Sequence, residues 1–525
     1  MNKTFKVVFN KARGALMVAN EVTSSVQKKG AKMVVAVATL MALGAVGNVA
    51  AQTFNDWTGE APKIDDPSVY EFNGSEYTGT GDIFGINIEK SAKGKLDNFD
   101  ITMHGKVGVD NVSSDKQIQG IRNYEGAGVE FGGDKLNIVV ETDFTGSGNN
   151  QIAAMEWQVG GKISATKVAT SATSLASNGK SVYGVSKGGK GTLEITSKDV
   201  NINLSTATKR ESDNYSEAIG FDIYGGELNT SEETRLTITG KSTNETKTTN
   251  GRDGASSIYG VKFEGGKGSF AGSTNIDVSA NGGNAIGVGV TNYFYNTSYG
   301  DNWDNASGKL NDLTVVANSK HSKAAGVEVA YTEGKDNQVI LGVSGTTNLT
   351  AETEDGKAYG IDLSGKTQAE LLGDVMIKTT ATNEKAVSIG VNVAEGSVML
   401  GAAGKTIDIA STGGALGDSI AVQVLKGGTL SVGAKNAKVK SLSLTVDKEA
   451  YFTGYIEGSQ LDVNAESFVQ NGSGFGLYIV GDTTNNKDSS LTMNVDKFYS
   501  KTSYGAIHTR QSAGTKADIN AKEFT

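Results

Sequence analysis

The stretch GFDIYGGEL (residues 220–228) contains both features that recur along this chain. It begins with Gly, an apolar residue, a variable residue and a second apolar residue, and a Gly-Gly pair precedes the next apolar position. Such alternation predicts a short strand whose two apolar side chains share one face while the variable side chain lies on the other. The variable position holds Asn, Glu, Asp, Lys, Gln or Tyr in different copies, so we expect it to face solvent.

This four-residue unit returns at intervals of roughly 27 to 43 residues, the range typical of solenoids and stacked arrays. A second and often a third short strand follow many copies, as at residues 193–195 and 375–378. The copies lie at residues 85–88, 128–131, 220–223, 260–263, 326–329, 360–363, 390–393 and 476–479, with a weaker copy at 287–290 and Ala in place of Gly at 421–424.

Three short strands per unit predict an all-β fold, a right-handed parallel β-helix with one unit per coil. We expect it to cover residues 81–525, after an N-terminal segment or cap at 52–80. The chain has 69 Gly and only 2 Pro, both before residue 68, which suits interior strands that need every backbone donor. A string of β-sandwich domains would predict a longer period and more Pro. Near the end, Phe468, Phe498 and Phe524 share a phase with Asn464, Asn494 and Asn520, which predicts ladders of Phe and Asn.

A different pattern occupies residues 1–51, which hold seven basic residues and one acid. An apolar run from Met33 to Val46 is too short to span a bilayer but is typical of the apolar region of a secretory signal, which is helical. Small residues at Val49 and Ala51 predict cleavage between Ala51 and Gln52. The basic region before the apolar run is much longer than a secretory signal requires.

That long basic region reads MNKTFKVVFNKARGALMVANE (residues 1–21) and resembles the extended signal peptide region of type V secretion (autotransporter) proteins of Gram-negative bacteria. Phe9 stands where that family usually has Trp. The resemblance implies passage through the inner-membrane export machinery and the periplasm, then contact with the outer-membrane insertion machinery, and a final place at the cell surface, in the outer membrane or in the medium. The matching residues are Asn2, Lys3, Phe5, Lys6, Val7, Val8, Asn10, Val18 and Glu21.

The repeat that follows looks like the passenger segment of a monomeric autotransporter. Members of that family end in a translocator β-barrel with an aromatic last residue. The sequence shows no series of barrel-like strands before Thr525, so we interpret it as a passenger truncated within a repeat, with the translocator barrel missing.

Composition restricts the chemistry open to this chain. Without Cys, disulfides and zinc–thiolate sites are impossible. Removing the basic leader from a chain of net charge −9 leaves −15, which offers no electrostatic footprint for nucleic acid. The only histidines are His104, His321 and His508, and no spacing indicates a metal or cofactor site.

Catalytic candidates are few. Gly417-Asp418-Ser419-Ile420 resembles the first block of GDSL-type esterases, but that mechanism needs a nearby His base, and the only His after Ser419 is His508. His104 is interpreted as a surface strand residue. Polysaccharide lyases on β-helices use clustered Asp with Arg or Lys; Arg210 and Arg235 have acids beside them, but neither group recurs in the next repeat.

Some acids and aromatics are further candidates for site residues. We interpret Asp222, Glu328 and Asp362 as outward, solubilising charges. Trp57, Trp157 and Trp303 are isolated, so the sequence does not support an aromatic sugar platform. The densest aromatic segment, Asn292 to Asn305, predicts a protruding loop that could contact a partner.

The sequence therefore predicts an exported, non-enzymatic surface protein, an adhesin or a self-association (aggregation or biofilm) protein, with contacts to host surfaces or to itself. The alternative is a secreted enzyme on a β-helix scaffold, such as a carbohydrate-active enzyme, whose site is assembled across coils.

Overall fold

The chain divides into two compact units, Met1–Gly47 and Asn48–Thr525. In the first unit, β1 (Phe5–Asn10) and β2 (Ala15–Asn20) form an antiparallel pair with Phe5 opposite Asn20. The predicted apolar signal run, with its expected helix, lies outside the described residues. The computed structural model describes residues 5–10, 15–20, 52–55, 69–73, 83–89, 93–105, 116–126, 128–142, 150–175, 180–207, 209–210, 217–246, 254–292, 306–331, 339–413, 419–447, 450–510 and 514–525.

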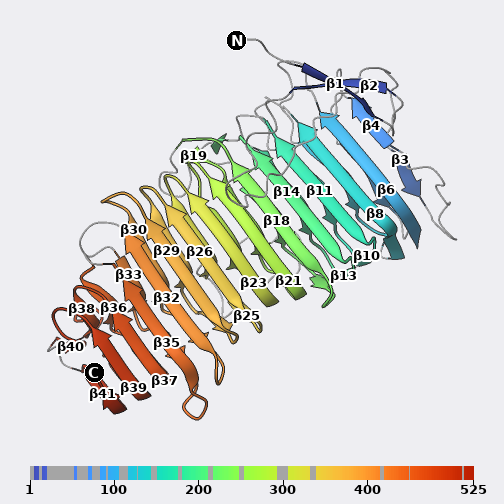
Figure 1. The fold of residues 1–525 in the computed structure, drawn as a ribbon. Coiled ribbons are helices and arrows are strands. Elements are labelled where there is room, and N and C mark those ends of the chain that lie inside the picture. Colours follow the sequence, from blue (N-terminus) through green and yellow to red (C-terminus); the bar gives the residue numbers. More distant parts are fainter. Residues whose placement is uncertain are drawn as a thin grey trace. The chain divides into compact units, whose positions relative to one another are not determined.

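The second unit is a stack of coils in which each strand pairs in parallel with its equivalents in the coils before and after it (Figure 1). One set of strands forms a 15-stranded parallel sheet, which we call the first face. Its strands are β3 (Gln52–Asn55), β5 (Ile83–Glu89), β7 (Lys116–Asn123), β9 (Asn150–Trp157), β12 (Lys180–Lys187), β16 (Glu217–Ile223), β20 (Ser257–Phe263), β22 (Ala285–Thr291), β24 (Lys323–Ala330), β27 (Lys357–Ser364), β30 (Val387–Ala394), β33 (Ser419–Leu425), β36 (Phe452–Glu457), β38 (Phe475–Val480) and β40 (Ile507–Thr509).

Two further faces complete each coil. Short strands form the second face: β10 (Gly161–Ile163), β13 (Thr192–Ile195), β17 (Glu227–Thr230), β25 (Val339–Val343), β28 (Thr367–Leu371), β31 (Ser397–Leu400) and β34 (Thr429–Val432). The third face holds β4 (Val69–Asn73), β11 (Lys167–Ser174), β14 (Asp199–Thr206), β18 (Arg235–Ser242), β26 (Thr347–Thr353), β29 (Val375–Ala381), β32 (Thr406–Gly413) and β35 (Val439–Val446).

Long strands cross from the second face to the third, so that β8, for example, pairs with both β10 and β11. These strands are β6 (Lys93–Gly105), β8 (Gly128–Thr142), β21 (Lys267–Ala280), β23 (Ser307–Ser319), β37 (Gln460–Asn471), β39 (Ser490–Lys501) and β41 (Lys516–Phe524). A small antiparallel pair joins β15 (Lys209–Arg210) to β19 (Gly254–Ala255). The predicted parallel β-helix is confirmed.

The N-terminal segment before residue 81 already contributes strands to this stack. β3 pairs with β5, Gln52 lying opposite Ile86, and β4 pairs with β6. Within the portion of the chain that the structure covers, no helix is long and apolar enough to cross a bilayer.

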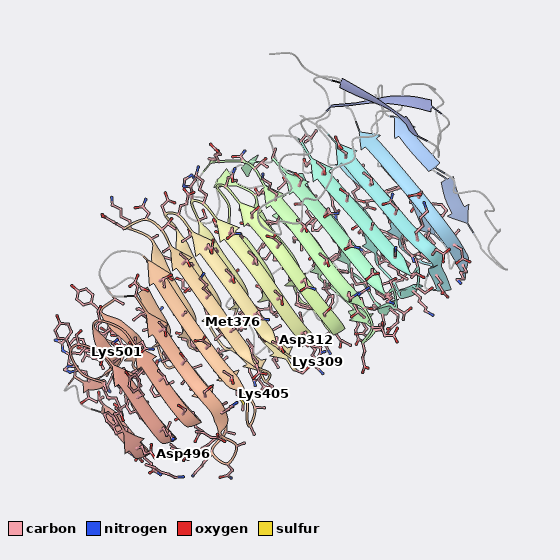
Figure 2. All side chains as sticks on the ribbon, in the orientation of Figure 1. Lys309, Asp312, Met376, Lys405, Asp496 and Lys501 are labelled. Atoms are coloured by element: carbon pink, nitrogen blue, oxygen red, sulfur yellow. The ribbon has the colours of Figure 1, made fainter. Side chains whose placement is uncertain are left out.

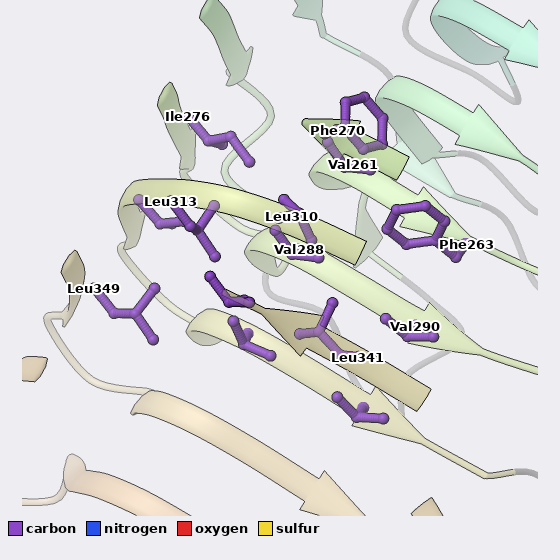
Figure 3. Packing of buried hydrophobic residues seen from close by; sticks show 14 of the residues in the cluster. Val261, Phe263, Phe270, Ile276, Val288, Val290, Leu310, Leu313, Leu341 and Leu349 are labelled. Carbon is purple, nitrogen blue, oxygen red and sulfur yellow. The ribbon is translucent and has the colours of Figure 1, made fainter. Parts of the chain in front are cut away.

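The two apolar positions of each repeat unit point into the core. Phe221 and Ile223 are fully buried, as are Val261 and Phe263 of the next coil. Figure 3 shows this packing, in which Phe263 meets Phe270 edge to face, with ring centroids 5.9 Å apart. Each coil adds buried apolar residues to these rows along the axis. Removing their apolar surface from water stabilises the fold by roughly 25 cal/mol per Å².

The ladders predicted near the end are present. Phe468 lies opposite Phe498 and Phe498 opposite Phe524, while Asn494 lies opposite both of its predicted partners. The rings of Phe468 and Phe498 stack with centroids 5.0 Å apart and planes 11° apart. The predicted register is therefore confirmed.

The Gly of the repeat unit makes room where the first and third faces meet. A Cβ on Gly360 would lie 2.5 Å from the carbonyl oxygen of Gly390 and would overlap Ile377 of β29. A Cβ on Gly220 would lie 2.6 Å from Cγ2 of Ile238, in the equivalent relation. Gly recurs there because a larger residue would separate the two faces.

Candidate functional surfaces

The outer side of the third face carries the most regular polar surface of the described residues. We call it the hydroxyl–amide face and define it as the outward residues of β11, β14, β18, β26, β29 and β32, together with those of the third-face parts of β21 (residues 273–280) and β23 (residues 312–319). Side chains there alternate with buried core residues, as in the pattern of β14. Hydroxyl and amide side chains make up most of it: Ser171, Thr173, Asn201, Asn203, Ser205, Thr237, Thr239, Asn275, Ser279, Thr314, Asn318, Asn348, Thr350, Thr380 and Thr412.

Strand register aligns these groups in rows along the axis. One row contains, in successive coils, Asn203, Thr239, Asp277, Val316 and Thr350, so that an acid and a valine separate its hydroxyl groups. Coils are about 4.8 Å apart, so each row offers a donor or acceptor at nearly every step. Charges of both signs are interspersed, and exposed Met376 interrupts the array (Figure 2). The face is polar, flat and without a dominant charge.

The outer side of the first face is different, because charged groups are buried there. Lys262, whose side chain is 7% exposed, forms ion pairs with Glu217 of the preceding coil and Glu264 of its own. Its ammonium also lies 4.7 Å from the ring centroid of Tyr259. Burial alone would lower the pKa of Lys262, but the two carboxylates raise it well above its ordinary value.

A second lysine, which is half-buried, lies further along the same face. Lys323 pairs with Glu328 of its own strand and, at 3.2 Å, with Asp362 of the next coil. Asn392 of the following coil donates a hydrogen bond to Asp362 at 2.9 Å. Burial opposes the charge of Lys323, but the carboxylates of Glu328 and Asp362 raise its pKa above the usual value. Each lysine therefore links neighbouring coils.

The interpretation of Asp222, Glu328 and Asp362 as solubilising charges was wrong. Asp222 is 4% exposed, and the other two carboxylates are committed to Lys323. Asp222 accepts a hydrogen bond from Ser186 at 3.4 Å. The neighbouring Lys262 forms its ion pairs with Glu217 and Glu264 instead. Burial and then the charge of Glu264 raise the pKa of Asp222 well above its ordinary range. Alternation in the sequence predicts on which side of the strand a side chain lies. It does not predict which residues cover that side.

A lysine also occupies the core itself. Lys187 lies opposite Trp157 in one neighbouring coil and Ile223 in the other, and it is fully buried. Its ammonium donates to the carbonyl oxygen of Gly188. Burial lowers the pKa of Lys187 to about 8. The unit Gly184-Val185-Ser186-Lys187 fits the repeat with Lys in an apolar position, which is the signal that could have revealed this residue.

The structure does not bring together the groups of a GDSL-type esterase. Ser419 is 1% exposed and donates to the carbonyl oxygen of Ser411 at 2.8 Å, within a cluster that includes Ser388. His508 lies three strands further along the first face, so the strand spacing alone separates the two residues by roughly 14 Å. Gly417 and Asp418 fall outside the described residues.

The remaining sequence candidates are scattered. Arg235 pairs at 2.6 Å with Asp199 of the preceding coil and not with its sequence neighbours. Arg210 lies in β15, and the backbone of His104 lies opposite Glu141. Across the described ranges, no group of three or more His, Asp and Glu residues could hold a metal ion.

Other predictions fall partly on residues that the structure does not describe. Of the predicted contact loop, only Asn292 belongs to the described residues, where it is buried. Of the predicted cleavage site, Ala51 lies outside the described residues, and Gln52 begins β3. Trp157 is a core residue with no exposed surface, whereas Trp57 and Trp303 lie outside the described residues.

One aromatic cluster was missed by the sequence analysis. We call it the aromatic ladder and define it as Phe452, Tyr455, Phe475, Tyr478 and His508, on the outer side of β36, β38 and β40. Tyr455 and Tyr478 are nearly parallel, with centroids 5.9 Å apart, and Tyr478 stacks on His508 at 5.0 Å. Phe452 stacks on Phe475 at 6.1 Å. The stacked partners lie in different coils and are distant in the sequence, so no local window contains the whole cluster.

Comparison with known proteins adds one finding. Residues 1–49 match the family model described as the Extended Signal Peptide of Type V secretion system. No curated protein and no solved structure matches the chain. Such a leader implies interaction with the export machinery and the outer-membrane machinery of type V secretion. The β-helix that follows it is consistent with a passenger segment. The chain therefore carries the extended signal peptide of type V secretion and is an autotransporter-type protein, exported through the periplasm to the cell surface or released from it.

Proposed function

We propose that this chain is a non-enzymatic passenger that mediates adhesion or self-association at the cell surface, and that the hydroxyl–amide face makes the contact. The observation that carries the proposal is the alignment of Ser, Thr and Asn in rows along the third face. The longest unbroken row spans five successive strands and consists of Asn201, Thr237, Asn275, Thr314 and Asn348. Export through type V secretion places such a face where other cells and surfaces can meet it.

The energetics favour contact through many weak bonds. A single exchanged hydrogen bond contributes about 0.5–1.5 kcal/mol net, so one coil binds weakly. Once one coil has made contact, the contacts of the other coils form within the same complex. The repetition of the rows over many coils therefore raises the overall affinity. The mixture of charge signs avoids long-range repulsion between two such faces.

The position of the hydroxyl groups supports a binding role over a catalytic one. Ser419 is engaged with other Ser residues beneath the surface, and Lys262 and Lys323 of the first face are paired with carboxylates. A secreted enzyme would instead require a reactive group open to substrate.

The test is a settling assay with cells that display the full chain. In one variant Asn203, Thr239 and Thr350 are replaced by Lys, which places three like charges along one row. We expect clumping, or binding to a surface, to fall to the level of cells without the protein.

A matched control places three Lys on the second face, at Asn229, Ser269 and Ser431, whose register positions also lie outward. We expect it to settle like the wild type. Equal settling of the wild type and the third-face variant would refute the assignment of the face, and settling no faster than in cells without the protein would refute adhesion altogether.

A further inference from the structure

The aromatic ladder is a surface separate from the hydroxyl–amide face, since it lies on the outer side of the first face. All five of its rings are half-buried, so part of each remains accessible. Upstream in the same row, Gln423 lies opposite Tyr455, and Asn392 lies opposite Gln423. Five successive strands thus present a row of amides and rings.

The rings leave some of their π surface free. Parallel rings in close contact have planes about 3.5–4 Å apart, so centroids 5.9 Å apart in Tyr455 and Tyr478 require a large offset. Neither ring then covers the whole face of the other. A π face is negatively polarised and attracts the weakly positive C–H groups of a ligand.

Polar groups border these rings with opposite charges. The hydroxyl of Tyr455 donates to Glu457 at 3.2 Å, and the positive charge of Arg510 acts on the same tyrosine. One acid and one base leave the ladder without net charge. This electrostatic pattern complements a neutral ligand and offers little to a polyanion, which would require a basic surface.

We propose that the aromatic ladder binds a neutral polysaccharide that lies along the axis of the helix. Sugar rings combine C–H faces, which pack on aromatic rings, with hydroxyl groups, which match the Tyr, His and amide groups. A polysaccharide also repeats the same chemistry along its length, as the ladder does once per coil.

The test uses the purified full chain in native electrophoresis through gels that contain a polymer. The neutral probes are hydroxyethyl cellulose and dextran, and the anionic probe is polygalacturonate. We expect at least one neutral polymer to retard the wild type. Replacing both Tyr455 and Tyr478 by Ser should weaken that retardation about tenfold or more.

The matched control is Tyr499→Ser, which removes an exposed tyrosine of β39 that lies outside the ladder. It should migrate as the wild type does, and circular dichroism of both variants should match the wild type. Tyr478→Phe, which keeps the ring, should retain binding.

Four results would overturn the proposal: no retardation by either neutral polymer, retardation by polygalacturonate alone, neutral binding that survives in the double variant, or equal loss in the control. Sedimentation of the wild type and the double variant tests whether the ladder binds a second copy of the chain. If the ladder instead held two copies of the chain together, the wild type would sediment as a dimer and the double variant as a monomer. That result would also overturn the proposal.

Discussion

Lys187 gives the sharpest test of the structure, because its charge is buried in an apolar row. The pKa of Lys187 is about 8 in the folded chain, against about 10.4 for an unfolded lysine. Folding therefore favours the neutral amine. At a pH between these two pKa values, the chain takes up a proton when it unfolds. The sign follows directly: stability rises with pH across the window from about 8 to 10.4.

The size of the effect comes from the same two values. Each pKa unit corresponds to about 1.4 kcal/mol, so the charged lysine costs about 3 kcal/mol at pH 7. At pH 9.5 much of this cost has disappeared, and about 1.4 kcal/mol remains. We therefore expect the wild type to gain about 2 kcal/mol between pH 7 and pH 9.5 relative to Lys187→Met, which has no proton to exchange.

Trp157 provides a local probe, since it lies opposite Lys187 in the neighbouring coil. With Trp57 and Trp303 replaced by Phe, urea unfolding followed by fluorescence reports the coils around Lys187. Lys187→Met should be more stable than its parent at pH 7, and the difference should narrow as pH rises. Lys167→Met, at an exposed position, serves as the control. A difference that stays constant from pH 7 to 9.5 would show that the lysine is not buried as a strained cation.

Three further predictions concern packing and the first face. Gly360→Ala should lower the free energy of unfolding by about 1–3 kcal/mol through overpacking, whereas Ala421→Gly should cost less; denaturant titration compares them. Folding favours the protonated form of Asp222, so its contribution falls as pH rises from about 3.9. Asp222→Asn should therefore match the wild type at pH 4 and exceed its melting temperature at pH 7. Lys262→Met should cost about 3–5 kcal/mol, because it leaves two carboxylates buried without their cation; urea unfolding measures the loss.

The sequence was sufficient for the architecture because each coil repeats the same local rules. Alternation gave the strands, and the shared phase of Phe468 and Phe498 gave their register, since identical side chains stack at equivalent places in a parallel solenoid. The leader could also be predicted from the sequence, because its apolar run and its basic flank are contiguous. These features are local or strictly periodic.

The surfaces could not be read in the same way. Asp222 looks like any outward acid, because its burial depends on residues from other coils that are distant in the sequence. The aromatic ladder joins Tyr455, Tyr478 and His508 only after three coils are stacked. The tryptophans are isolated in the sequence and give no sign of the aromatic ladder, which consists of Phe, Tyr and His. The repeat pattern places Lys187 at an inward position, so its burial could have been predicted from the sequence. Such a prediction would have contradicted the usual preference of lysine for solvent.

The buried ion pairs of the first face bear on how such a uniform stack keeps its register. Apolar rows of Val, Ile and Leu are nearly interchangeable from coil to coil, so they penalise a slip by one coil only weakly. Lys262 and Lys323 differ from these rows, because each reaches carboxylates in a particular neighbouring coil. A slip would leave those charges buried and unpaired, at a cost of several kcal/mol each. The pairs therefore add little to stability over apolar residues but distinguish one alignment of coils from the next. A chain without Cys cannot form a disulfide and so has no covalent means of making that distinction.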